Sequence, residues 1–161
     1  MKTKRNKKIE EAMASVSLAR EKILYNVLGE SLADRLFFYF HGTVDFDYEE
    51  DRGGSFIECN LPTLFSALCL FIECAGDTLA TVRMHAKEDV AEIRMCLHEG
   101  RELPKKEIYE SALLGGMEYS RGAHGISLFL SLSRETILNL FANRETITAK
   151  LDIIAKSFGI L

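Results

Sequence analysis

The segment from Asn60 to Gly76 places the strongest constraint on the fold of this 161-residue chain. Asn60 is a good helix N-cap, Pro62 suits the first turn, and Gly76 stands just beyond the expected end. Between these signals nearly every helical face is apolar, so we predict a helix that is buried on all sides. A chain of this length buries roughly two-thirds of its unfolded surface, which is enough for a core of this kind.

The sequence after Gly76 changes to a period of two. Apolar residues alternate with polar ones over residues 80–85 and again over residues 91–97, with a polar turn at residues 86–89 between them. This alternation predicts an antiparallel hairpin that has one buried face and one wet face.

The remaining segments have weaker patterns. Residues 9–28 and 126–140 carry apolar residues at helical spacing, and residues 106–114 also favour a helix before Gly115. Residues 36–48, 55–59 and 146–153 are rich in β-branched or aromatic residues and favour strands. This order predicts an α+β fold, a two-layer sandwich of helices on a mixed or antiparallel sheet, preceded by an N-terminal helix.

Charge is unevenly distributed along the chain. The net charge of −4 divides into five positive charges among the first eight residues and a net −9 in the rest. An acidic body argues against nucleic-acid binding, and the basic start is typical of a solvated terminus. We predict that residues 1–33 form a basic tail and a dimerising or linking helix, and that residues 34–161 form the main domain.

Cysteine usage and hydropathy indicate the compartment. The four cysteines form no C-x-x-C pair, and neither they nor the histidines have the spacing of metal ligands. The longest apolar run, residues 61–75, would span only about 22 Å as a helix, which is short of a membrane core. We therefore expect a cytoplasmic protein without membrane insertion, and no metal site.

Two glycines, Gly122 and Gly125, precede an apolar run that has the pattern of a helix. Backbone amides at the start of a helix can hold an anion, so this segment suggests phosphate binding. Glu73 raises a second functional question, since a carboxylate near the end of a buried helix needs a partner or water.

Three landmarks in this order resemble the ATP-binding domain of sensor histidine kinases, gyrase-type ATPases and anti-sigma-factor kinases. The resemblance covers roughly residues 56–154. Residues 67–75 resemble the asparagine-box helix of that family, with Glu73 retained and Cys74 at the position of the Mg²⁺-binding Asn. A thiol is a poor ligand for a hard cation that prefers oxygen.

The other two landmarks are the glycine boxes of the family. His98 stands where an Asp accepts a hydrogen bond from adenine, and Gly100 is retained. Gly122 and Gly125 match the second glycine box, while Ser127 stands where a further Gly is usual. The resemblance therefore implies a histidine-kinase-like ATPase fold in residues 34–161, with a degraded nucleotide site.

The resemblance leaves three functions open. The favoured hypothesis is a module of bacterial two-component signalling that has no cofactor and binds a response regulator or a kinase, or forms a homodimer. The second is a working kinase domain that binds ATP and Mg²⁺, with Glu73 acting on water or metal and His98 facing the base. The third is a phosphorelay phosphotransferase. No complete catalytic set is visible, and His41 has the setting of a structural residue rather than a phosphoacceptor.

Overall fold

A computed structural model describes residues 4–14, 17, 19–52, 54–76, 78–97, 110, 115–123, 125–134 and 144–161. Its principal elements, in chain order, are α1 (Lys4–Met13), β1 (Glu21–Leu24), α2 (Tyr25–Phe40), β2 (Val44–Tyr48), β3 (Phe56–Cys59), α3 (Leu61–Ala75), β4 (Ala80–Lys87), β5 (Val90–Cys96), β6 (Glu118–Arg121), β7 (Gly125–Ser133) and α5 (Arg144–Ser157).

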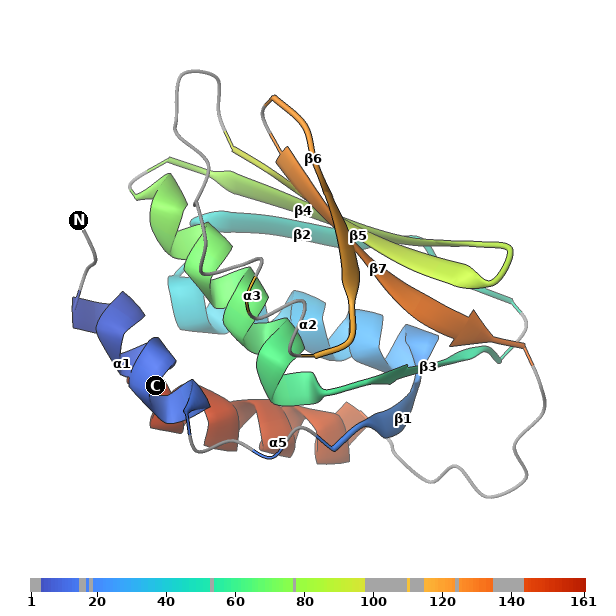
Figure 1. Cartoon of the computed structure of the whole chain (residues 1–161), viewed down its shortest axis with the longest axis horizontal. Helices are drawn as coiled ribbons and strands as arrows, with labels where there is room; N and C mark the ends of the chain where they lie inside the picture. The colour runs from blue at the N-terminus through green and yellow to red at the C-terminus, as the bar shows by residue number, and fades with distance from the viewer. Residues whose placement is uncertain are drawn as a thin grey trace.

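The described strands form one mixed sheet in the order β1-β3-β7-β5-β4-β2 (Figure 1). The β2–β4 pair is parallel, and the other pairs are antiparallel. Strand β7 is central because β5 follows one of its edges from Gly125 to Ser131. Its other edge is shared by β6, opposite residues 126–129, and by β3, opposite residues 132–133.

The helices gather on one side of this sheet (Figure 1). Alternate strand residues point into that side and are buried, such as Val82 on β4, Ile93 on β5 and Leu128 on β7. They share one core with α3 and with the Leu28, Leu32 and Leu36 stripe of α2. This arrangement confirms the predicted α+β fold, in which helices form one layer and the sheet forms the other.

Helix α3 has the boundaries and the burial that the sequence predicted. Asn60 Oδ1 accepts a hydrogen bond from Thr63 N at 2.9 Å, which is the expected N-cap. Asn60 Nδ2 also donates to the carbonyls of Ser17 and Ala19 at 2.8 and 2.7 Å, so the same side chain fixes the segment before β1. The predicted hairpin is confirmed as β4 and β5, and the short strand as β3.

The predictions for the first third of the chain are wrong in two places. The helix expected over residues 9–28 ends at Met13, and residues 21–24 instead form β1 beside β3. Residues 36–40, expected in a strand, are the last turn of α2. Here the left-handed backbone of His41 ends the helix, with φ 51°. Aromatic residues favour strands only weakly, and burial of Leu36, Tyr39 and Phe40 on one helical face outweighs that preference.

The predictions for the last third of the chain are wrong, because a strand forms where a helix was expected and a helix forms where a strand was expected. Residues 125–133 form β7 rather than the start of a helix over 126–140, and the later part of that segment lies outside the described residues. Residues 144–157 form α5 rather than a strand over 146–153. In β7 the buried apolar residues recur at every second position, whereas in α5 they recur at every fourth position, namely Ile147, Leu151 and Ala155.

Two further predictions concern boundaries. The helix expected over residues 106–114 falls almost wholly outside the described residues. The predicted division between residues 33 and 34 falls inside α2, and the separate roles of the two parts stay a prediction.

Among the helices that the structure describes, none is long and apolar enough to cross a membrane.

Candidate functional site

The predicted site residues that the structure describes fall into two groups. Glu73 and Cys74 are half-buried in the last turn of α3, on the helical side of the sheet. Gly122, Gly125 and Ser127 lie in the hairpin of β6 and β7. His98 and Gly100 lie outside the described residues, so their predicted roles stay predictions.

The end of α3 lines a small hollow of about 170 Å³. Glu73 borders it together with Tyr39 and His41 from the end of α2 and with Ile160 near the C-terminus. Gly122, Gly125 and Ser127 of the β6–β7 hairpin do not line this hollow. The carboxylate and the glycines that the family resemblance assigns to one nucleotide therefore border separate hollows in the described part of the chain.

The glycine segment closes a hairpin instead of starting a helix. Gly122 N–H donates to the Gly125 carbonyl at 2.8 Å, so this amide is already used within the turn. Gly125 begins β7 directly against β5, where a Cβ would lie 2.6 Å from the Met95 carbonyl oxygen. The helix start that the sequence suggested for phosphate binding is thus replaced by an antiparallel turn.

A second hollow, which we call the sheet-face hollow, lies beside this turn on the side of the sheet away from the helices. It has a volume of about 230 Å³ and is lined by Arg94, Cys96, Ser120, Arg121, Gly122, Gly125 and Ser127. The register explains this grouping, because Arg94 on β5 lies opposite Ser127 on β7, which lies opposite Ser120 on β6. Three of the predicted site residues therefore do line one hollow, with two arginines that the sequence analysis did not select.

The carboxylate of Glu92 forms a network at the edge of the sheet-face hollow. Ser127 Oγ donates to Glu92 Oε2 at 2.6 Å, and His85 Nε2 lies 3.2 Å from Glu92 Oε1. Arg94 Nε lies 3.7 Å from Glu92 Oε2. Strand alternation places all four residues on the wet face, but their meeting depends on the pairing of β4, β5 and β7.

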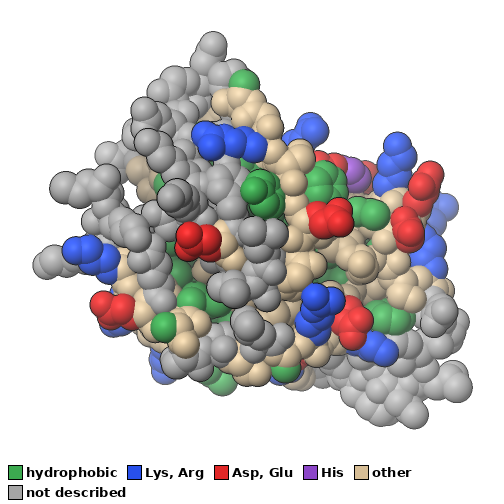
Figure 2. Space-filling view, viewed as in Figure 1, with side chains coloured by type: hydrophobic (Ala, Val, Ile, Leu, Met, Phe, Trp, Pro, Cys, Tyr) green, Lys and Arg blue, Asp and Glu red, His purple; other side chains and the backbone are tan. Residues whose placement is uncertain are grey.

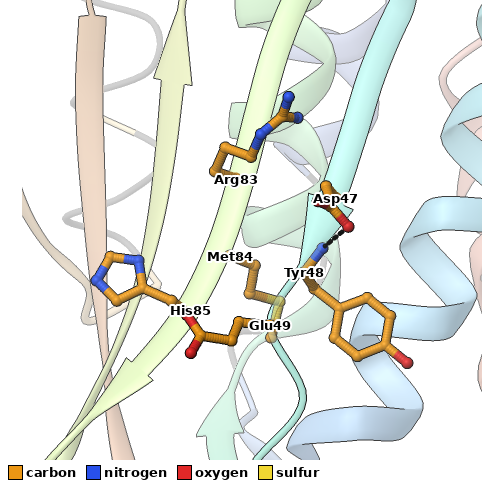
Figure 3. A pocket seen from close by; sticks show the side chains of 6 residues that line it. All are labelled: Asp47, Tyr48, Glu49, Arg83, Met84 and His85. Atoms are coloured by element: carbon orange, nitrogen blue, oxygen red, sulfur yellow. Dashed lines mark hydrogen bonds between the residues drawn. The ribbon is translucent and has the colours of Figure 1, made fainter.

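A third hollow of about 440 Å³ lies over β2 and β4 (Figure 3). It is lined by Asp47, Tyr48, Glu49, Arg83, Met84 and His85. Figure 3 shows the Tyr48 ring directed away from His85, so the two side chains do not converge on one ligand position. Burial, with nearby Glu30 and Glu50, raises the pKa of the Tyr48 hydroxyl, so this phenol stays protonated at neutral pH.

Large apolar side chains are exposed on the helical layer. Phe37 and Phe38 at the end of α2 are 65% and 52% exposed, and Ile153 on α5 is 69% exposed. We call these three residues, which lie on two helices that contact each other, the α2–α5 patch. The helices beneath it are joined by Asp152, which accepts hydrogen bonds from Tyr39 Oη at 2.5 Å and from Arg35 Nη1 at 3.3 Å.

The Arg35 guanidinium also lies 5.1 Å from the centre of the Phe38 ring, within the range of a cation–π contact. Burial and the bond to Asp152 raise the pKa of Tyr39, so its hydroxyl remains a donor to the carboxylate at all physiological pH values. The exposed Phe38 ring therefore lies beside the hydrogen-bonded junction of α2 and α5.

The described residues contain no candidate metal centre. Among them no group of three or more His, Cys, Asp or Glu residues could hold a metal ion. The face shown in Figure 2 carries acidic and basic side chains interspersed rather than gathered by sign. The pattern of charge on this face thus does not single out a strongly acidic or basic partner.

Neither the family models nor the curated proteins contain a match to this chain. Among solved structures, the chain is similar to the cytoplasmic segment of histidine kinase QseC, with 13% identity and a TM-score of 0.44. The match covers 79% of this chain and 88% of the other. A likeness at this level does not establish shared site residues or a shared activity.

Proposed function

We propose that this chain is a histidine-kinase-like module of bacterial two-component signalling that binds a protein partner instead of turning over ATP. The three sequence landmarks support the family assignment. The α2–α5 patch supports the mode of action and carries the proposal, because large aromatic side chains at the surface are typical of protein interfaces.

The patch has the physical properties of a binding surface. Phe37 and Phe38 follow one another on a helix, so they present two rings over adjacent parts of the α2 surface. The ion-paired junction at Asp152 holds α2 against α5, which limits the entropy lost when a partner docks. A partner that covers both rings gains apolar burial without any rearrangement of this part of the fold.

The chemistry at the predicted nucleotide positions favours binding of a protein partner over ATP turnover. Cys74 offers a thiol where Mg²⁺ requires oxygen, and the Gly122 amide is bonded to Gly125. The hollows beside Glu73 and beside Gly125 are each smaller than the roughly 300 Å³ from which typical ligand pockets begin. We therefore derive no phosphoryl-transfer step from these residues.

The partner surface is tested with the Phe37→Ser/Phe38→Ser double variant. Full-length protein is measured by biolayer interferometry against purified receiver domains and sensor-kinase cytoplasmic regions from the same organism. We expect a specific partner to bind at least about tenfold more weakly to the double variant, as for aromatic interface residues elsewhere. Leu79→Ser is the matched control, since Leu79 is also an exposed apolar residue but lies just before β4.

Two outcomes would overturn the proposal. One is a set of receiver domains and kinase regions that all fail to bind the wild-type chain. The other is saturable micromolar binding of Mg²⁺·ATP, measured by calorimetry and lost in Glu73→Gln, which would identify a working nucleotide site. Thermal unfolding of each variant shows whether a loss of binding reflects loss of the fold.

A further inference from the structure

We propose that His41 is a contact residue of the α2–α5 patch, where its imidazole forms a hydrogen bond with a polar side chain of the protein partner. This inference rests on the proposed function and adds to it the residue that makes an otherwise apolar surface selective. Two observations carry it, namely the backbone conformation of His41 and the position of its side chain beside the patch.

The backbone of His41 has a conformation that favours glycine. His41 ends α2 with φ 51° and ψ 41°, in the left-handed region where a Cβ is unfavourable. Glycine is the usual residue at this place after a helix, and here it follows one residue later, as Gly42. Histidine at this position therefore costs stability, and such local strain is commonest at functional sites.

The turn that contains His41 lies directly against the patch. His41 follows Phe37 and Phe38 by about one helical turn. The amide of Gly42 donates to the Phe37 carbonyl at 3.3 Å, and a Cβ on Gly42 would lie 3.6 Å from Cε2 of the Phe37 ring. Since His41 is exposed, a partner that covers the two rings also reaches the imidazole.

Hydrogen bonds hold this turn in place. Thr43 N and Thr43 Oγ1 both donate to the Phe40 carbonyl, at 3.1 and 2.8 Å. The imidazole therefore starts from a defined backbone position, which limits the conformational entropy that docking removes.

The hollow at the end of α3 gives the partner side chain a place beside His41. The hollow has a volume of about 170 Å³, and Thr43, Ile72 and Glu73 line it together with His41. At about 30 Å³ for each water molecule in the liquid, this is room for one side chain. A neutral imidazole offers one donor and one acceptor, so it pairs with a polar side chain. A partner that places an apolar side chain here leaves the imidazole nitrogens unpaired, which disfavours that partner.

The test compares His41 with Glu88, the other non-glycine residue that has a positive φ in the described part of the chain. Glu88 has φ 56° and lies in the β4–β5 turn. His41 is near the opposite end of β4, where Ala80 N donates to the Thr43 carbonyl. The eight residues of β4 separate the two sites by about 25 Å, so Glu88 is a matched control for backbone strain away from the patch.

Full-length His41→Gly and Glu88→Gly are measured by thermal unfolding and by interferometry against the receiver domain or kinase region that binds the wild type. We expect both variants to raise Tm by about 2–4 °C, because glycine relieves the left-handed strain. Only His41→Gly should weaken partner binding, by about threefold to tenfold, as for loss of one hydrogen bond. A residue with a merely structural role would not lower binding while it raises stability.

His41→Ala separates the imidazole from the flexibility of glycine. This variant keeps a Cβ in the strained conformation, so it should weaken binding as much as His41→Gly without the gain in Tm. A loss of binding that His41→Ala does not share would assign the effect to a looser turn and would remove His41 from the interface.

Three further results contradict the inference. These are unchanged binding in both His41 variants, an equal loss of binding in Glu88→Gly, and no gain of Tm in His41→Gly. If the His41 variants bind normally while Phe37→Ser/Phe38→Ser does not, the proposed function stands and only the role of His41 is lost. A wild-type chain that binds no partner removes both proposals.

Discussion

The two faces of the sheet are built from the same strands but have opposite chemistry. On β5, Ile93 is fully buried against the helical layer, whereas its neighbour Arg94 faces water beside Glu92 and Ser127. The buried face is continuous with α2, α3 and α5 and provides the cohesion of the fold. The wet face contributes little apolar burial, so its side chains are free to form hollows and polar networks.

The largest difference between the faces should appear when these two neighbours are truncated. We expect Ile93→Ala to lower the free energy of unfolding by about 2–5 kcal/mol, because it leaves a cavity in the core. Arg94→Ala should change it by less than about 0.5 kcal/mol. Urea unfolding of both variants measures the contrast, and equal losses would mean that the two faces do not divide stability in this way.

Two glycines at the edge of the sheet-face hollow should differ in how well they tolerate a side chain. Gly125→Ala should cost about 1–3 kcal/mol, since the new Cβ collides with the Met95 carbonyl and β5 or β7 must shift. In Gly122→Ala the nearest atom to the new Cβ is the Gly125 carbonyl oxygen at 3.7 Å, an ordinary contact. We expect nearly unchanged stability for Gly122→Ala in the same urea assay. A destabilised Gly122 variant would show that the turn, rather than strand contact, sets the glycine requirement.

The smallest expected effect is a pH dependence on the buried side. Burial, with a contribution from Glu21, raises the pKa of the Cys59 thiol from 9.0 to about 12. Between these values the unfolded chain releases a proton that the folded chain retains, so stability falls as the pH rises above 9. The loss is about 1.4 kcal/mol for each pH unit above 9.

Urea unfolding at pH 8 and pH 10, with a reductant present, measures this slope. Cys59→Ala should show a shallower loss of stability than the wild type over the same interval, even if its stability at pH 8 is lower. If stability falls equally with pH in the wild type and in Cys59→Ala, the pH dependence does not come from the Cys59 thiol.

The reliable parts of the sequence prediction are those with complete local signals. Helix α3 has an N-cap, an early proline and a terminal glycine around an apolar run, and the β4–β5 hairpin has strict alternation around a polar turn. The exchanged elements lack such signals. Residues 126–133 have apolar side chains compatible with both periods, and pairing with β5 decides for a strand.

The candidate site was only partly visible in the sequence. The sequence predicted a turn at the glycine segment, and Gly122 and Gly125 do form one, whereas the role of this segment in ligand binding stays a prediction. Arg94, Arg121 and the His85–Glu92–Ser127 network were missed, since they lie on strands whose register is set by long-range pairing. Alternation along each strand could identify the wet face but not which of its residues become neighbours.

The sequence alone determined that this chain has an α+β fold around a buried central helix, because local capping and hydrophobic periodicity act within a few residues. Tertiary structure decided which ambiguous segments became β1, β7 and α5, and which polar side chains met around the sheet-face hollow. Those choices depend on burial and on hydrogen bonds between strands that are distant in sequence. The predicted nucleotide positions illustrate the difference, since Glu73 and Gly125 were predicted from sequence resemblance to share one site but border separate hollows in the fold.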